Sequence, residues 1–233
     1  MHVHDVAADL AAEQHALDDI VSGLDDARWS TDTPSQGWTV ADQIGHLTYF
    51  DQAAATAITD PEAFRASMRD LIDDASGDDD TVDDLTLDAY RTLAPTALLD
   101  VWRSGRARLA DAAATLADDD RVAWYGPSMG SRSFLTARLM EAWAHGQDIV
   151  DAVGGHRPPT DRLRHIAQFV CGEVPRRHGQ TPHARWPLEC AQCAEMIGVV
   201  VDQHPVLVRG QSWRQIAKIR SGPTAQIQLP RPP

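Results

Sequence analysis

The sequence predicts a mainly α-helical protein whose first 169 residues form a bundle of four long helices. Three observations support this prediction. Apolar residues repeat at helical spacing in four long stretches, capping residues mark where helices begin, and Pro or Gly marks where they end. The length of 233 residues suits one large domain with a small appendage. We expect an up-down bundle with one crossover connection, followed by a poorly defined C-terminal tail.

The first helix is expected over residues 3–25, where one apolar stripe runs between acidic and Gln residues. A second helix begins with Thr39 as its N-cap and Asp42 three residues later, a carboxylate variant of the capping box. It extends to Thr59, and Pro61 opens a further helical stretch to Ser76.

An acidic run, residues 77–80, is predicted to be a solvated loop. The alternative is a calcium site, but the alternating ligand spacing of an EF-hand loop is absent. A third long helix is expected from Pro95, which suits a first helical turn, to the acidic residues 118–120. After a turn-rich loop over residues 124–130, a fourth helix is expected from Ser133 to Ala152, closed by two glycines, and a short fifth helix after Pro159.

The composition restricts the classes of function. The net charge of -13 argues against a general nucleic-acid binder, because phosphates would be repelled. No apolar run is long enough for a membrane span, and the N-terminus lacks the features of a signal peptide, so we expect a cytoplasmic protein with no membrane partner. Three cysteines, an odd number, do not make a disulfide framework.

Residues 170–233 differ in composition from residues 1–169. They hold only 4 of the 34 acidic residues, all three cysteines and 8 of the 14 prolines. Two short strand-like runs, residues 197–201 and 206–208, are the ordered pieces expected there. The pair Cys190 and Cys193 is a weak redox or zinc motif, because no second such pair accompanies it. We hypothesise that this tail is translated from a shifted reading frame, which resequencing the gene would test.

The fourth helix carries a candidate metal-binding pair. Glu141 and His145 are four residues apart, so their side chains lie on one face, as in helical metal sites. An exposed pair without a metal is the alternative. His46, in the second helix, is flanked by apolar residues and is either a hydrogen-bonded core histidine or a third ligand. Two His and one Glu make the three-ligand set of a catalytic zinc, which leaves a fourth position open.

Two segments carry a family resemblance, residues 37–47 (GWTVADQIGHL) and residues 141–148 (EAWAHGQD). Together they resemble the signature segments of the metal-binding domain of mycothiol-dependent maleylpyruvate isomerases, which belongs to the DinB/YfiT-like superfamily of four-helix bundles. The resemblance covers about residues 5–169, and residues 170–233 do not resemble the C-terminal α/β domain of the relatives.

The resemblance implies a divalent metal, usually zinc, held by His46, Glu141 and His145. It implies that Asp148, which matches an acidic position of the signature, orients a ligand or the incoming group. It also implies mycothiol as cosubstrate: its thiolate adds to an activated double bond, allows rotation and is eliminated. Arg138, one turn before Glu141, is a candidate for binding a substrate carboxylate, and a structural or exposed salt bridge is its alternative.

Three functions remain open. The chain is a thiol-dependent isomerase or transferase acting on a small molecule, a metal-dependent hydrolase that needs no thiol, or a non-enzymatic metal-binding bundle. The sequence leaves the substrate, the metal and the choice between monomer and homodimer open.

Overall fold

The computed structural model describes residues 2–75 and 79–172, which form eight helices and one two-stranded hairpin. The helices are α1 (Val3–Val21), α2 (Asp26–Trp29), α3 (Val40–Thr59), α4 (Pro61–Asp74), α5 (Asp79–Arg91), α6 (Pro95–Ala113), α7 (Ser131–Ala152) and α8 (Leu163–Gly172). The strands are β1 (Arg121–Val122) and β2 (Met129–Gly130). No helix in these two ranges is long and apolar enough to cross a membrane.

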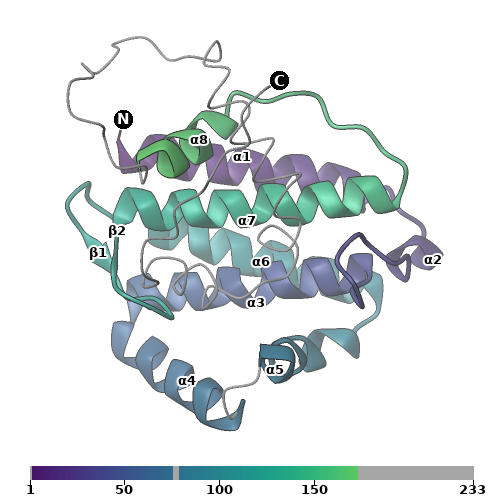
Figure 1. Ribbon diagram of the computed structural model, residues 1–233, viewed down its shortest axis with the longest axis horizontal. Helices are drawn as coiled ribbons and strands as arrows, with labels where there is room; N and C mark the ends of the chain where they lie inside the picture. Colours follow the sequence, from purple (N-terminus) through teal and green to yellow (C-terminus); the bar gives the residue numbers. More distant parts are fainter. Residues whose placement is uncertain (1, 76–78, 173–233) are drawn as a thin grey trace, which may run out of the picture.

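Four long helices, α1, α3, α6 and α7, pack side by side as the predicted bundle (Figure 1). Helix α3 runs antiparallel to α1, to which α2 connects it, and α7 runs antiparallel to α6, to which the β1–β2 hairpin connects it. The α4–α5 segment crosses the bundle from the end of α3 to the start of α6, so α3 and α6 are parallel. Helix α8 packs against α7. The predicted mainly α, up-down bundle with one crossover is therefore confirmed.

The predicted helix boundaries are confirmed where capping chemistry was present. Thr39 and Asp42 form the capping box of α3, since the Thr39 hydroxyl accepts from the Asp42 N–H and the Asp42 carboxylate accepts from the Thr39 N–H at 2.9 Å. Pro61 and Pro95 occupy the first turns of α4 and α6. After α7 the chain turns at Gly154, whose φ of 63° favours glycine.

Four expectations were wrong. The third long helix, α6, ends at Ala113 rather than at the acidic residues 118–120. The first helix ends at Val21 rather than at residue 25, and Asp25 caps the short α2 instead. Asp79 and Asp80, predicted to lie in a loop, begin helix α5, which was not predicted. The turn-rich loop follows strand β1, and its last two residues, 129–130, form strand β2, which pairs with β1 as a hairpin. Residues 170–172 of the expected tail belong to α8, and the rest of the tail, with its two strand-like runs and the pair Cys190 and Cys193, lies outside the described residues. The shifted reading frame and the division of the chain at residue 170 stay predictions.

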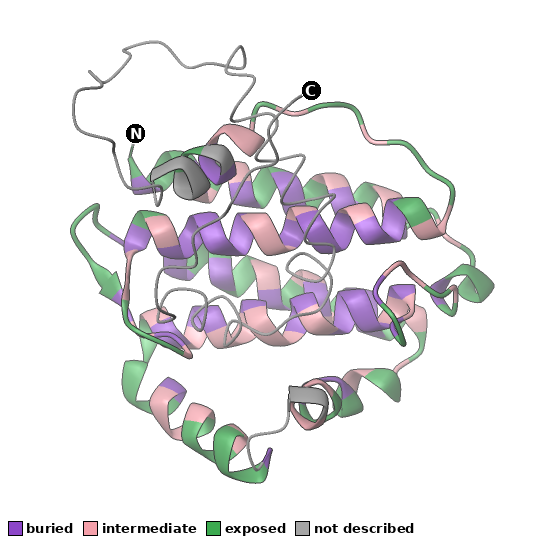
Figure 2. Ribbon diagram, viewed as in Figure 1, coloured by how far each residue is buried: buried purple, intermediate pink, exposed green. Residues whose placement is uncertain are grey.

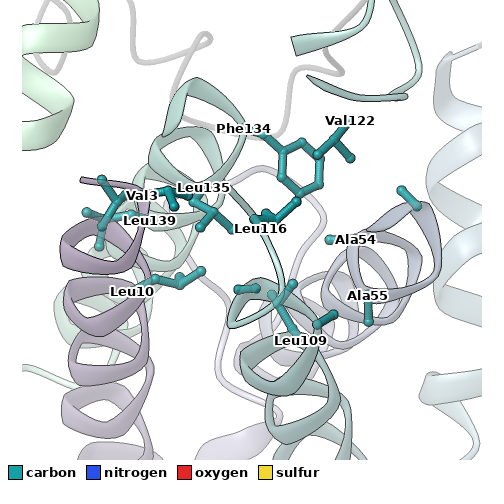
Figure 3. Packing of buried hydrophobic residues seen from close by; sticks show 14 of the residues in the cluster. Val3, Leu10, Ala54, Ala55, Leu109, Leu116, Val122, Phe134, Leu135 and Leu139 are labelled. Atoms are coloured by element: carbon teal, nitrogen blue, oxygen red, sulfur yellow. The ribbon is translucent and has the colours of Figure 1, made fainter. Parts of the chain in front are cut away.

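The core consists of two hydrophobic clusters, one at each end of the bundle. Figure 3 shows the first, where side chains from α1, α3, α6, α7 and β1 meet. The second surrounds Trp102 and includes residues of α1, α3, α6 and α7. In Figure 2 long stretches of α3 and α7 are coloured as buried, whereas α4 is mostly exposed or intermediate. Buried polar residues interrupt the apolar stripes between the two clusters, namely Gln14, Asp51, Arg138 and His145.

Candidate metal centre

Helix α3 places His46 between the two hydrophobic clusters. The capping box fixes where the helix begins, and Arg91 of α5 donates from Nε to Asp42 at 2.7 Å, which ties α5 to the same turn. Next to His46, Gly45 allows α5 to come close, because a Cβ at this position would lie 3.1 Å from Cβ of Tyr90. His46 therefore lies on a helix that is held at its start and along its outer side.

Helix α7 brings Glu141 and His145 to the same point. Nε2 of His145 lies 3.2 Å from Oε2 of Glu141, and Nε2 of His46 lies 3.3 Å from that same oxygen. The two imidazole rings have centroids 4.4 Å apart. One potential ligand atom from each of the three residues falls within 4.8 Å of the other two. The three residues that the sequence suggested are thus brought together from two helices.

Burial and mutual contact set the charges of this cluster. Burial and, to a lesser extent, the neighbouring His145 together lower the pKa of His46 to about 4 against the opposing effect of Glu141, so this imidazole is neutral at neutral pH. Burial alone would raise the pKa of Glu141, but the facing imidazoles outweigh this effect and hold that pKa well below its usual value. An ionised carboxylate therefore faces a neutral imidazole.

This donor set fits a divalent metal ion. Neutral imidazole nitrogens and a carboxylate oxygen are ordinary zinc ligands, and three protein ligands leave one position for another molecule. Nδ1 of His46 is buried and has no hydrogen-bond partner among the described residues. The other nitrogen of this ring, Nε2, faces the Glu141 carboxylate and is the one that a cation at the cluster would bind.

Aromatic side chains surround the two histidines. The indole of Trp38 is stacked on the ring of His145 at 11° and 5.8 Å, and its centroid lies 5.1 Å from that of His46. On the other side, Phe50 lies 4.5 Å from His46, centroid to centroid. Tyr125 of the hairpin loop packs edge-on against Phe50. These rings make the surroundings of the cluster largely apolar, which strengthens electrostatic interactions within it.

Arg138 forms a buried ion pair one turn before Glu141. Its Nη2 donates to Oδ1 of Asp51 at 3.0 Å, and both side chains are almost wholly buried. Asp51 also accepts from Gln14 at 2.8 Å. The guanidinium carbon of Arg138 lies 5.9 Å from the centroid of Phe50, on which His46 also packs. Nε and Nη1 of Arg138 have no acceptor among the described residues.

Asp148 forms no hydrogen bond with the three candidate ligands and instead contacts Ser35, which precedes α3, and Gln43, in the first turn of α3. Its Oδ2 accepts from the Ser35 hydroxyl at 2.6 Å and from Nε2 of Gln43 at 3.3 Å. Oε1 of Gln43 in turn is in hydrogen-bond contact with Nδ1 of His145. Sequence reasoning missed Gln43, although it lies three residues before His46 and therefore on the same face of α3. It also missed Asp51, the partner of Arg138.

The fold and the cluster together define a helical bundle with a candidate metal site between two of its long helices. Comparison with known proteins gives the family. A model of the mycothiol maleylpyruvate isomerase N-terminal domain matches residues 10–150, and the chain belongs to this family. The predicted family resemblance is thereby confirmed.

Two uncharacterised proteins from two strains of Mycobacterium tuberculosis are each 44% identical to the chain over 162 residues. The matched segment covers 70% of this chain and 62% of each relative, so it spans less than two thirds of their length. Crystal structures of the mycothiol-dependent maleylpyruvate isomerase and of a point mutant of it have a similar fold, with TM-scores of 0.56. Their sequences are 17% and 16% identical to this chain, over 74% of this chain and 69% of theirs.

Proposed function

We propose that the chain binds a divalent metal ion, zinc in the first instance, through His46, Glu141 and His145, and uses it to activate a low-molecular-weight thiol. The observation that carries the proposal is the convergence of three ligand atoms from two helices within 4.8 Å. The family supports mycothiol as the thiol, because its name describes a mycothiol-dependent isomerase domain.

A metal ion held by these three residues would lower the pKa of a thiol bound at the open position, so that the thiolate is present at neutral pH. The protein supplies the surroundings of that reaction. Trp38 and Phe50 flank the two imidazoles and reduce the access of water. Glu141 contributes one negative charge, so a divalent ion with these three ligands keeps a net positive charge.

Arg138 is the residue that we assign to an acidic substrate. Its Nη2 is bound to Asp51, whereas Nε and Nη1 are donors without an acceptor among the described residues. A carboxylate that reached these two donors would form charge-assisted hydrogen bonds near Phe50 and the candidate metal centre. Maleylpyruvate, the substrate in the name of the family, is an electrophile with carboxylate groups and is therefore the first molecule to assay.

The test is the metal content of the purified, untagged full chain, measured by elemental mass spectrometry. We expect about one zinc per chain, and a loss of that zinc in the double variant His46→Ala, His145→Ala. The matched control is the double variant His4→Ala, His15→Ala, which removes two exposed histidines of α1 and should keep the metal. Absence of zinc from the wild type, even after zinc is added back, would overturn the proposal.

Turnover then separates the three functions that the sequence left open. Conversion of maleylpyruvate that requires both zinc and mycothiol is the expected result. Zinc-dependent hydrolysis of a substrate in the absence of any thiol would instead support the metal-dependent hydrolase. A metal-dependent rise in melting temperature without any turnover would reduce the role of the metal to stabilisation.

A further inference from the structure

A buried hydrogen-bond chain leads from Asp148 through Gln43 to His145. Gln43, which is fully buried, donates from Nε2 to Oδ2 of Asp148 at 3.3 Å and to the hydroxyl of Thr33 at 2.9 Å. Its Oε1 is the partner of Nδ1 of His145. The Ser35 hydroxyl donates to the same oxygen of Asp148 at 2.6 Å, so two donors hold this one carboxylate oxygen.

The chemistry of these groups fixes the direction of every hydrogen bond in the chain. A carboxylate only accepts, so the side of the Gln43 amide that faces Asp148 must be its NH2 group. The amide oxygen of Gln43 then faces His145, and because this oxygen also only accepts, the proton must be on Nδ1 of His145. A neutral imidazole with its proton on Nδ1 has a lone pair on Nε2.

That lone pair points at Glu141. Nε2 of His145 and Oε2 of Glu141 lie 3.2 Å apart, and in this tautomer both atoms are acceptors. Two acceptors at this distance repel each other unless a cation lies close to both. His46 has no comparable constraint, since its Nδ1 has no partner among the described residues. The chain of hydrogen bonds therefore acts on one of the two histidines only.

We propose that Gln43 is a positioning residue which, held in one amide orientation by Asp148, keeps His145 in the Nδ1-protonated tautomer and presents Nε2 as a metal ligand. The hydrogen bonds by themselves place a proton on Nδ1 of His145; that Nε2 carries no proton is part of the proposal. The use of this tautomer in metal binding rests on the function proposed above. Asp148, expected from the sequence to orient a ligand, acts on His145 indirectly, because it fixes the orientation of the Gln43 amide.

The first test measures the tautomer in metal-free protein by long-range ¹H–¹⁵N NMR of ¹⁵N-labelled histidine. The signals of His145 are assigned by their loss in His145→Ala. We expect the Nδ1-protonated pattern in the wild type and in the control Gln147→Leu, whose amide bonds Asp151 on the exposed side of α7. We expect a loss of that fixed pattern in Gln43→Leu. A wild-type His145 protonated on Nε2, or an unchanged pattern in Gln43→Leu, would overturn the proposal.

The second test exchanges the carboxylate and the amide. In Gln43→Glu, two carboxylates would lie at a contact that is now 3.3 Å long, so we expect a lower melting temperature and weaker zinc binding. Adding Asp148→Asn should rescue both, because an amide at position 148 donates to a carboxylate at position 43, which still accepts from Nδ1–H. Failure of the second substitution to rescue the first would contradict the proposed chain.

Zinc affinity, measured by competition with a chromophoric chelator, links the chain to the metal. We expect Gln43→Leu to bind zinc about 10 to 100 times more weakly than the wild type, as is usual when the partner of a ligating histidine is removed. Unchanged affinity in Gln43→Leu would defeat this inference and leave the proposed function intact. No zinc binding by a wild type that has the Nδ1-protonated tautomer would defeat the proposed function and leave the tautomer assignment intact.

Discussion

Trp38 and His145 are stacked, with an angle of 11° between their rings, although one precedes the first turn of α3 and the other lies in α7. Trp38 is 6% exposed and also lies against His46. The indole therefore covers one side of both candidate histidine ligands. It also joins the start of α3 to α7, so its removal should affect stability and metal binding together.

We predict that Trp38→Ala lowers the free energy of unfolding by about 3 to 5 kcal/mol, the usual cost of a large aromatic truncation in a core. Trp38→Phe keeps a ring against both histidines and should cost clearly less. Urea denaturation of both variants measures the difference. Equal losses in the two variants would show that the ring stacking contributes little.

Gly45 should not tolerate a methyl group. In Gly45→Ala the new Cβ would meet Cβ of Tyr90 at 3.1 Å and a methyl of Leu87 at 3.3 Å, which forces α5 away from α3. We expect a destabilisation of about 1 to 3 kcal/mol, typical of overpacking. Gly126→Ala is the control, because a Cβ there meets nothing within 4 Å. Thermal unfolding of both variants tests the prediction, and a Gly45→Ala melting temperature at or above that of the control would contradict it.

Glu13 anchors the segment between α7 and α8. It is fully buried and forms ion pairs with Arg157 and with Arg162, the latter at 2.7 Å. Burial lowers the pKa of Arg157 to about 10, and the charge of Arg162 contributes, so this arginine is still charged at neutral pH and needs its partner.

Glu13→Gln should therefore lower the free energy of unfolding by about 3 to 5 kcal/mol, the usual cost of removing one partner of a buried ion pair. The matched control is Glu62→Gln, which breaks an exposed pair with Arg65 and should change stability by less than about 1 kcal/mol. Chemical denaturation compares the two. Similar small losses would mean that solvent reaches Glu13.

Asp18 should make stability depend on pH. Burial alone would raise its pKa, but hydrogen bonds and charges from Arg103 and Arg106 outweigh burial and lower it below 3.8. A depressed pKa in the folded state gives stability that is present above the unfolded pKa and is lost as the pH falls through the folded pKa. The difference in unfolding free energy between wild type and Asp18→Asn should be constant near neutrality and should shrink below about pH 4. A difference that stays constant down to pH 2 would refute this linkage.

Local signals predicted the helices that make the site, and tertiary packing explains what was missed. The capping box at Thr39 and the prolines at α4 and α6 act within one turn of the chain, so the sequence alone reveals them. Helix α5 was not predicted because it is rich in Asp and Thr, which are weak helix formers. It is held largely by contacts with α3, where Leu87 is buried. Its acidic start, mistaken for a loop, suits the N-terminus of a helix.

The candidate site also combines features that one helix encodes locally with features that depend on packing between helices. The spacing of Glu141 and His145 is a property of one helix and was predictable, whereas the position of His46 in its own helix left open whether it is a core histidine or a third ligand. The ion pair of Arg138 with Asp51 and the contact of Gln43 with His145 depend on how α3 is rotated relative to α7. No local pattern encodes that rotation, so these partners appear only in the folded chain.

The separation of His46 and Glu141 by 95 residues also has a kinetic consequence. A loop of that length must close before both side chains can reach one ion, and any cation shared by them gains its full affinity only after α3 and α7 have docked. If docking follows the rate-limiting step of folding, a bound metal should slow unfolding and leave the folding rate almost unchanged. The bound ion would then lengthen the lifetime of the native state without making the protein fold faster.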